Sequence, residues 1–532
     1  MPTKDKAKAA AVVAPNLLAV SGYPLTDDVE SERSEYLKTL RSVLRSNSVR
    51  VGVVGLGYVG LPLAMAMAES GAMVTGFDVD VERIESLNAG RSVIDDVDDA
   101  TLQRALDNGK FEATSDFELM GEQHVLFVCV PTPITSTKDP DLSYLRRAAE
   151  TIAAHLRPGQ LIVVESTTYP GTTEEVVKPL LEERGFRVGR DVFLAFSPER
   201  IDPGNQHFSV RETPKVIGGC TPACSELAAE IYSRTIERDK IHIVSSPATA
   251  EMTKLLENIF RSVNIALVNE LALLCGRMGI DVWEVIEAAA TKPFGFMPFY
   301  PGPGVGGHCI PVDPYYLSWK ARQFDFHTRF IELAAEVNSY MPVHVVHRVF
   351  EALNSVGKSV KGAKVLVLGV TFKRDVSDYR NSPVLTIMER LLRAGADVLY
   401  SDPYVPKLDL PLAGGEGNNG PWNGEFIAPR VAGQHGASVG DAVNGSAWPE
   451  VATASDTSVD VVANFAWNRE PGVVQLQHTA LTPELLQECD CVVIGVDHKA
   501  FDFAQVGEYA QLVVDTRNAM RHVPAKGVVW GL

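Results

Sequence analysis

Short apolar runs separated by amphipathic stretches dominate residues 49–245, and this alternation predicts a parallel sheet with helices on both faces. Strands are expected at residues 51–54, 72–77, 125–130, 161–164 and 192–195. The pattern therefore predicts a doubly wound α/β domain that ends near residue 245.

The pattern becomes helical from Ala248 to about Met278 and again over roughly 330–353. Helices of this length suggest that a central segment, 246–355, connects two domains and forms oligomers. A second α/β pattern covers 356–532, with strands expected at 363–369, 397–400, 491–494 and 512–515. We thus expect an α/β protein in which a long-helix segment joins two similar doubly wound domains.

Two segments lack this periodicity. Residues 1–48 form an N-terminal extension that we expect to be loosely attached. Four apolar residues in it nevertheless have the spacing of a short amphipathic helix: Tyr36, Leu37, Leu40 and Leu44. Residues 411–456 are rich in Gly, Asn, Ala and Ser, which is typical of a surface insertion.

The charge and the cysteine content narrow the function. A net charge of −18 over 532 residues opposes binding to a polyanion, so we expect a small nucleotide ligand and no nucleic acid. The seven cysteines are scattered without zinc-ligand spacing, which predicts no metal site and fits a reducing compartment. Because the apolar runs are far shorter than the roughly 20 residues of a membrane span and no secretory signal precedes them, we expect a soluble cytoplasmic protein.

A glycine-rich turn, Gly55-Leu-Gly-Tyr-Val-Gly60, directly follows the first expected strand and precedes a helix-forming stretch. In a dinucleotide-binding turn of this form, Gly55 permits the tight turn, Gly57 lets the backbone approach the pyrophosphate, and Gly60 lets helix and strand pack closely. Asp78 closes the second strand, where a carboxylate binds the ribose hydroxyls and repels a 2′-phosphate. The sequence therefore predicts NAD as the cofactor, and with it hydride transfer.

A loop rich in glycine and proline, 299–308, leads directly to Cys309, and Asp313 follows four residues later. Cysteines are usually small buried hydrophobes, which is what we expect of three that stand in apolar stretches: Cys129, Cys275 and Cys491. A thiol on a loop beside an NAD site can instead add to an aldehyde, and oxidation of the thiohemiacetal gives a thioester. Cys309 would thus extend an alcohol oxidation to the acid.

Polar residues also occur on the expected long helix. Lys254, Asn258 and Arg261 share one helical face. Such a face is often solvated, but apolar neighbours surround these residues, so we expect them to line a site. His308 is more simply a loop residue held by backbone partners than a general base.

Seven motifs, in order along the chain, resemble the UDP-glucose/GDP-mannose dehydrogenase family from about residue 51 to residue 531, except in the insertion. They are Gly55 to Gly60, Val130-Pro-Thr-Pro133, Glu165-Ser-Thr-Thr-Tyr-Pro-Gly171, Phe196-Ser-Pro-Glu-Arg-Ile-Asp-Pro-Gly204, Lys254-Leu-Leu-Glu-Asn258, Gly304-Val-Gly-Gly-His-Cys309 and Gly369-Val-Thr-Phe-Lys-Arg-Asp375. The resemblance implies two Rossmann-like domains, one for NAD and one for the UDP part of a UDP-sugar, joined by a long helix through which dimers form. It also implies oxidation of the sugar at C6.

The resemblance assigns roles to residues. It implies that Cys309 is the nucleophile, that Lys254 and Asn258 stabilise oxyanions, and that Asp313 assists proton movement. The residues implied in thioester hydrolysis are Glu199 as the base and Thr168 as a ligand of the water. Those implied in cofactor binding, besides the glycines and Asp78, are Tyr58, Val59, Pro131, Thr132, Lys373 and Arg380, the last two by closing over the site. Those implied in substrate binding, besides Lys254 and Asn258, are Arg200, Arg261, Phe299, Tyr300, Gly304, Gly306 and Arg517.

Three positions differ from the glucose branch of the family, which has Asn, Glu and Lys where this chain has Ser197, Pro203 and Val312. The runs 197–204 and 294–304 resemble the N-acetylhexosamine branch. UDP-N-acetylglucosamine is the best match, UDP-N-acetylmannosamine the second and UDP-glucose the third. The family implies a role in making precursors of surface polysaccharide.

Two alternatives belong to other classes of protein. A two-electron dehydrogenase of the 6-phosphogluconate or hydroxyacid kind needs neither Cys309 nor a second α/β domain. A non-catalytic sugar-nucleotide sensor would be suggested by loss of Cys309, Lys254 or Glu199, all of which are present.

Overall fold

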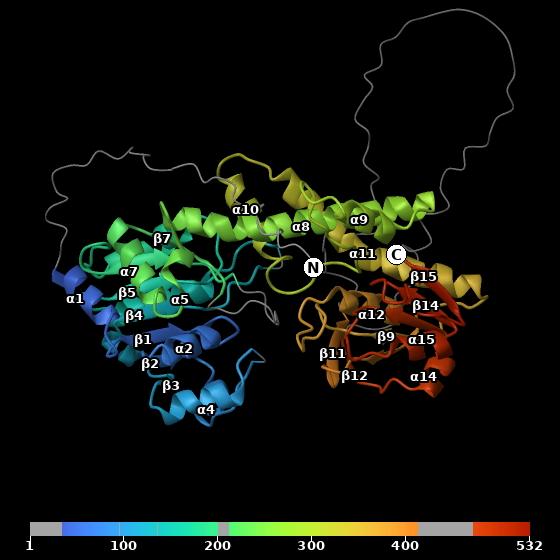
Figure 1. Ribbon diagram of the computed structural model, residues 1–532, viewed down its shortest axis with the longest axis horizontal. Coiled ribbons are helices and arrows are strands. Elements are labelled where there is room, and N and C mark those ends of the chain that lie inside the picture. The colour runs from blue at the N-terminus through green and yellow to red at the C-terminus, as the bar shows by residue number, and fades with distance from the viewer. Residues whose placement is uncertain (1–34, 95, 136, 201–211, 413–471) are drawn as a thin grey trace, which may run out of the picture.

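The computed structural model describes residues 35–94, 96–135, 137–200, 212–412 and 472–532. Its N-terminal half is built on an eight-stranded sheet of order β3-β2-β1-β4-β5-β6-β7-β8, parallel except between β6 and β7 (Figure 1). The strands are β1 (Arg50–Val54), β2 (Met73–Phe77), β3 (Phe111–Thr114), β4 (Val125–Val128), β5 (Leu161–Val164), β6 (Phe193–Phe196), β7 (Lys215–Gly219) and β8 (Ile241–Val244). The five strands expected here are confirmed, and β3, β7 and β8 are additional.

Helices cover both faces of this sheet, as a doubly wound domain requires. They are α1 (Glu35–Leu44), α2 (Gly60–Glu69), α3 (Val81–Asn88), α4 (Asp99–Asp107), α5 (Ser143–His155), α6 (Lys178–Glu182) and α7 (Pro222–Tyr232). One hydrophobic core contains residues of α2, α4 and α7, and a second contains residues of α5 and α6. From β1 the chain adds strands on one side as far as β3 and then continues with β4 on the other side of β1. Doubly wound folds bind ligands at this switch point between β1 and β4.

The extension is attached more firmly than expected. Leu40 and Leu44 of α1 are buried in the same core as α7, and Arg45 pairs with Glu230 of α7 at 2.8 Å. Residues 35–44 are therefore a docked amphipathic helix, because their apolar stripe finds a partner on α7. Residues 1–34 lie outside the described part of the chain.

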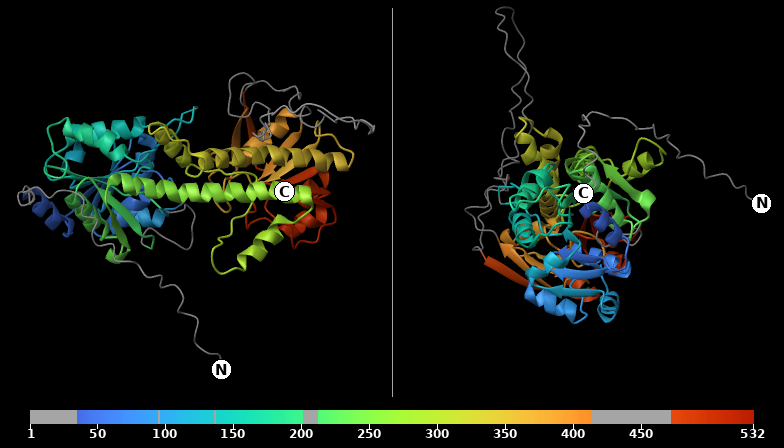
Figure 2. Two further views of the ribbon diagram at one scale, coloured as in Figure 1. Left: turned by 90° about the horizontal axis from the view of Figure 1, so that it is seen from above. Right: turned by 90° about the vertical axis from the view of Figure 1, so that its left-hand side faces the viewer.

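The central segment contains α8 (Pro247–Met278), α9 (Val282–Ala290), α10 (Asp313–Arg322) and α11 (Arg329–Ser355). Ser246 caps α8 by accepting a hydrogen bond from Thr249 N at 3.2 Å, and Gly279 ends it with a φ of +70°. α8 and α11 run side by side between the two α/β domains (Figure 2).

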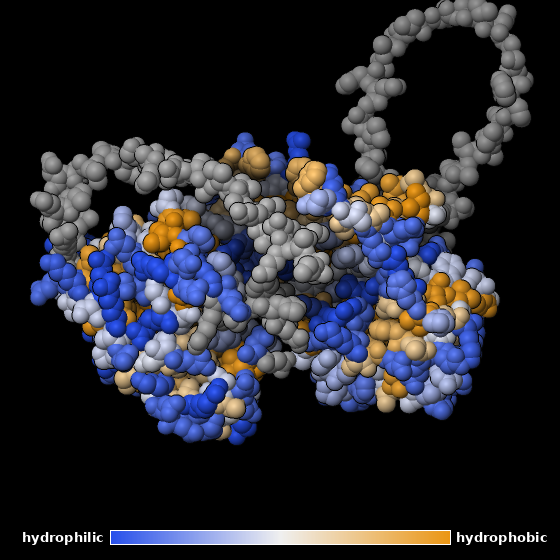
Figure 3. All heavy atoms as spheres, in the orientation of Figure 1, coloured by the Kyte–Doolittle hydropathy of each residue, from blue (hydrophilic) through white to orange (hydrophobic). Residues whose placement is uncertain are grey.

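α8 differs from the expectation that every apolar run is far shorter than a membrane span. By length and composition alone, α8 is long and apolar enough to cross a membrane, a test that the core helix of a soluble protein also passes. Charged residues interrupt its apolar sequence, and a helix tolerates them on one face. Figure 3 shows hydrophobic residues gathered over α9 and the C-terminal end of α8. The exposed apolar residues of α8 are Met252, Leu256, Phe260, Leu267, Leu271, Leu274 and Met278.

A second sheet follows, with the all-parallel order β10-β9-β13-β14-β15. Its elements are β9 (Lys364–Leu368), α12 (Pro383–Arg393), β10 (Asp397–Ser401), α14 (Pro483–Glu488), β13 (Cys491–Ile494), α15 (Phe503–Tyr509), β14 (Leu512–Asp515) and β15 (Val528–Gly531). α11 and α12 share a core with one face of this sheet, and α14 and α15 share a core with the other. The expected second doubly wound domain is thus confirmed.

The insertion leaves the domain from a two-stranded sheet. β11 (Lys407–Leu412) and β12 (Gly472–Gln477) pair antiparallel, and Leu412 lies opposite Gly472. The first two residues of the expected insertion, 411–456, are the last two residues of β11. The rest of the insertion lies outside the described residues. Leu412 and Gly472, which border the residues outside the described part of the chain, are adjacent.

Candidate active site

The turn between β1 and α2 has the geometry that its glycines predict. Gly55 has a φ of +92°, and a Cβ on Gly60 would lie 1.8 Å from the carbonyl oxygen of Gly55. A Cβ on Gly57 would meet nothing within 4 Å, so the space before the α2 N-terminus stays open to a pyrophosphate. Tyr58 and Val59 complete this turn. These residues fit a dinucleotide.

Asp78 lies at the end of β2, beside the glycine turn. Its Oδ2 accepts hydrogen bonds from Leu56 N at 2.8 Å and from Arg83 Nη1 at 2.9 Å. Arg83 was missed by sequence reasoning, although an arginine five residues after the acid is a readable signal. Pro131 and Thr132 follow β4 at the switch point, where the Tyr316 hydroxyl donates to Thr132 O.

Four predicted residues meet where α8 passes the start of α10. Asp313, the first residue of α10, is buried, and its Oδ2 accepts a hydrogen bond from Asn258 Nδ2 at 2.5 Å. Burial raises the pKa of Asp313 to about 7, and the nearby charge of Lys254 opposes that rise. Asp313 N donates to Cys309 O at 2.8 Å. A carboxyl group with a pKa near neutrality, on a residue whose backbone is bonded to that of Cys309, is suited to moving protons.

Cys309 is exposed, whereas burial raises the pKa of Cys129 and Cys491. The loop before Cys309 is held by the C-terminal domain: a Cβ on Gly304 would lie 2.9 Å from Pro383 Cβ, and one on Gly306 would lie 2.8 Å from Asn381 O. Glycine is needed at both positions because the second domain packs directly on the loop backbone.

His308 joins this loop to both domains. Arg380 Nη2 lies 2.8 Å from His308 Nε2, and its guanidinium carbon lies 5.0 Å from the centre of the Tyr58 ring. Burial and the charge of Arg380 lower the pKa of His308. Because a guanidinium only donates, His308 Nε2 accepts the hydrogen bond from Arg380, and Arg380 also lies beside Tyr58 of the glycine turn. Lys373 lies on the loop between β9 and α12 that also carries Arg380.

Glu199 follows β6, and its Oε2 accepts a hydrogen bond from Lys215 Nζ at 3.0 Å. Lys215 Nζ also lies 3.3 Å from Glu165 Oε1, which the Tyr232 hydroxyl contacts from the other side. Sequence reasoning missed this buried group. The buried Thr168 Oγ1 makes no hydrogen bond within the described residues.

The N-terminal half of α8 ties these parts together. Glu251 accepts hydrogen bonds from Gly171 N at 2.5 Å and Thr173 N at 2.9 Å, in the loop that carries Thr168. Glu257 pairs with Arg200, the neighbour of Glu199, at 2.5 Å. Arg200 is thus held by α8, and Arg261, unlike Lys254 and Asn258, is exposed.

Arg517 brings the C-terminal domain to the other end of the loop. Its Nη1 would lie 2.7 Å from a Cβ on Gly302, and its Nε donates to Asp497 Oδ1 at 3.2 Å. The two aromatic residues predicted for the substrate pack on helices: Phe299 meets Phe260 with ring centres 5.7 Å apart, and Tyr300 stacks on Trp283 at 5.8 Å.

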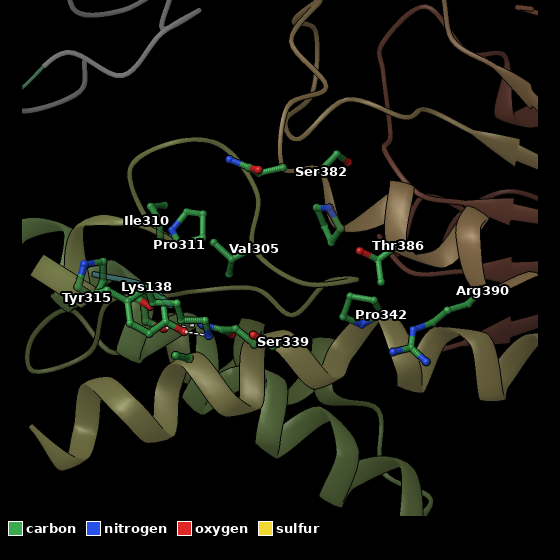
Figure 4. A pocket seen from close by; sticks show the side chains of 16 residues that line it. Lys138, Val305, Ile310, Pro311, Tyr315, Ser339, Pro342, Ser382, Thr386 and Arg390 are labelled. Atoms are coloured by element: carbon green, nitrogen blue, oxygen red, sulfur yellow. Dashed lines mark hydrogen bonds between the residues drawn. The ribbon is translucent and has the colours of Figure 1, made fainter. Parts of the chain in front are cut away.

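A cavity of about 380 Å³ lies between the catalytic loop, α11 and α12 (Figure 4). Val305, Ile310 and Pro311 line it from the loop, and Lys138 and Arg390 are its basic residues. None of the residues predicted for the site lines this cavity.

A dinucleotide turn at a sheet switch point, with a thiol-bearing loop between two doubly wound domains, defines an NAD-dependent dehydrogenase. Three family models match the chain: the NAD binding, central and UDP binding domains of the UDP-glucose/GDP-mannose dehydrogenase family, at residues 49–236, 248–340 and 366–419. The chain belongs to this family, and it is an NAD-dependent nucleotide-sugar dehydrogenase.

Relatives with named substrates are also similar. The UDP-N-acetyl-D-glucosamine 6-dehydrogenase of Pseudomonas aeruginosa is 42% identical over 68% of this chain and 84% of its own. The UDP-N-acetyl-D-mannosamine dehydrogenase of Pyrococcus horikoshii is 40% identical over 67% and 84%. A solved structure of the UDP-D-ManNAc dehydrogenase from P. horikoshii has a TM-score of 0.72 at 32% identity, and the match covers 91% of this chain and 99% of that one.

Proposed function

We propose that this protein oxidises the C6 alcohol of UDP-N-acetylglucosamine to the uronate in two steps, through a thioester on Cys309. The single observation that carries the proposal is the group around Asp313. Its buried carboxyl, with a pKa near neutrality, accepts a hydrogen bond from the Asn258 amide near the Lys254 ammonium, and its backbone N–H donates to the backbone carbonyl of the exposed Cys309. Two NAD molecules, bound in turn, would each accept one hydride, and the proton of the C6 hydroxyl would pass to water in the first oxidation.

The side chains divide the remaining work. The Cys309 thiolate adds to the C6 aldehyde, and the ammonium of Lys254 and the amide of Asn258 stabilise the oxyanion that results. Asp313, whose pKa of about 7 lets it exchange protons near neutral pH, takes up the proton of the thiol. Oxidation of this thiohemiacetal leaves the uronyl group on Cys309 as a thioester.

Hydrolysis then releases the product. Glu199 takes a proton from a water molecule, the hydroxide adds to the thioester carbonyl, and the thiolate of Cys309 leaves. Thr168 is suited to hold that water because its buried hydroxyl has no other hydrogen bond within the described part of the chain.

The sugar is inferred from two observations. The P. aeruginosa relative is named for N-acetylglucosamine, and this chain has Ser197 and Val312 where the glucose branch differs. The second candidate is UDP-N-acetylmannosamine, which the names of the P. horikoshii relative and structure favour.

A panel of UDP-sugars with NAD tests the proposal. We expect the highest kcat/KM with UDP-N-acetylglucosamine and two NADH for each sugar consumed. One NADH per sugar with free aldehyde would contradict the thioester route, and a higher kcat/KM with the mannosamine epimer would replace the substrate.

We further infer that the protein acts as a homodimer in the cytoplasm and supplies surface polysaccharide synthesis. The exposed apolar face of α8 supports the dimer, because seven large apolar residues on one helix are a costly surface to leave in water. Light scattering of the purified protein measures the oligomeric state, and a monomer at micromolar concentration would contradict this inference.

A further inference from the structure

We propose that Lys215 is a positioning residue for thioester hydrolysis: its ammonium orients Glu199 toward the water and is itself held in place by Glu165 and Tyr232. This inference rests on the proposed function, because it assigns Lys215 to the hydrolytic step alone.

The geometry forms a chain of contacts that runs outward from the core. Tyr232 on α7 donates its hydroxyl to Glu165 at the end of β5, and Glu165 Oε1 lies 3.3 Å from Lys215 Nζ on β7. Lys215 Nζ then reaches Glu199 Oε2 at 3.0 Å. The exposed fraction of the side chains rises along this chain, from 0% for Glu165 to 3% for Lys215 and 16% for Glu199.

Each part of this arrangement limits the motion of the next. The lysine ammonium lies 5.1 Å from the centre of the Tyr232 ring, so the ring closes one side of it and Glu165 fixes its direction. Glu199 Oε1 accepts a hydrogen bond from the backbone N–H of Arg200 at 2.6 Å. Both oxygens of Glu199 are therefore held, and the lysine contributes the contact that comes from inside the sheet.

Lys215 and Glu165 have opposite effects on the ionisation of Glu199. An ammonium close to a carboxylate favours its ionised form, whereas a second carboxylate nearby disfavours that form. Lys215 thus keeps Glu199 available as a base, and Glu165 limits how strongly it does so. A methionine at 215 has a side chain of similar length but would supply neither contact.

The experiment compares Lys215→Met with Glu165→Gln, both from the same buried group, and uses Glu199→Gln as the reference for lost hydrolysis. Stopped-flow absorbance of NADH follows the oxidations, and acid quench with intact-mass analysis follows the uronyl group on Cys309. In Lys215→Met the oxidations should proceed, hydrolysis at pH 7 should slow by up to about 10²-fold, and the adduct should accumulate.

The pH profile separates positioning from a loss of packing. The acidic limb of the hydrolysis rate should move to higher pH in Lys215→Met and to lower pH in Glu165→Gln. A limb unmoved by Lys215→Met, or moved in the same direction by both variants, would overturn the inference. If Glu199→Gln stalls with an adduct while Lys215→Met hydrolyses normally, only this inference fails, whereas normal turnover of Glu199→Gln without an adduct would remove the proposed role of Glu199.

A double variant covers the case in which Lys215→Met does not fold. Lys215→Met with Glu165→Gln removes one ammonium and one carboxylate together, so the cluster keeps its net charge. Hydrolysis should remain slow in the double variant because Glu199 still lacks its anchor, and hydrolysis at the parent rate would overturn the inference.

Discussion

Replacing Asp313 by asparagine should make the protein more stable at alkaline pH while removing most of its activity. Asp313 is 3% exposed, and burial raises its pKa from 3.8 to about 7 despite the opposing charge of Lys254. A shift of this size corresponds to on the order of 4 kcal/mol. The folded protein binds the proton of Asp313 more tightly than the unfolded chain does. The contribution of this proton to the free energy of unfolding is therefore complete below about pH 4 and is lost as the pH rises through 7.

Urea unfolding of the ligand-free protein at pH 5 and pH 8 measures this effect. An asparagine does not titrate, so the free energy of unfolding of Asp313→Asn relative to the parent should rise by about 2 to 3 kcal/mol between the two pH values. Asp239→Asn is the control, because Asp239 is exposed and its replacement should leave the difference between the pH values unchanged.

Activity gives the second half of the test. Loss of a positioned acid or base typically slows a reaction by roughly 10² to 10⁴-fold. The rate of NADH formation by Asp313→Asn should therefore decrease by a factor in that range relative to the parent. A stability difference that is the same at both pH values would show that Asp313 does not titrate between them. An active variant would show that another group moves the proton.

Three further predictions concern the nucleophile, the cofactor turn and the insertion. Cys309→Ser should abolish acid formation but leave the Kd for NAD, measured by calorimetry, nearly unchanged; turnover like the parent would remove Cys309 from the mechanism. Gly57→Ala should fold normally and bind NAD at least about tenfold more weakly, a loss of about 1.4 kcal/mol. Gly60→Ala should fail to fold because its Cβ meets the backbone of Gly55. Equal circular dichroism spectra and equal NAD affinities of the two variants would contradict this reasoning. Replacing residues 413–471 by an Asn-Gly turn should leave Tm and NADH formation close to those of the parent, since Leu412 and Gly472 already face each other, and loss of folding would show that these residues are structural.

Much of the fold could be predicted because the central strands are buried on both faces and read as uninterrupted apolar runs. Several of the missed strands lack that signal, and β7, although buried throughout, has only two large apolar residues in the run Lys-Val-Ile-Gly-Gly. β12 and β15 each have several exposed residues, and β8 has none that is fully buried. Their pairing depends on neighbours far away in the sequence, so local pattern alone does not reveal it.

The candidate site divides in the same way. Gly55, Gly60 and Cys309 stand out because a tight turn or a loop thiol restricts the residue type locally. Lys215 and Glu165 do not, because β5 and β7 are separated by β6, and the contact between these residues exists only once the three strands lie in one sheet. The docking of α1 was likewise hidden, since it depends on a partner surface on α7 that its own sequence does not describe.

The first half of α8 restricts how this protein can evolve. Three parts of the site are held from one uninterrupted helix: the loop at Gly171 by Glu251, Arg200 by Glu257, and Asp313 by Asn258 with the charge of Lys254 nearby. Inserting or deleting one residue between Glu251 and Asn258 would rotate every later side chain by about 100° and displace it by about 1.5 Å along the axis. Descendants of this gene can therefore exchange residues there but cannot change the length of the segment, whereas the gap between β11 and β12 tolerates added sequence because its two ends already meet.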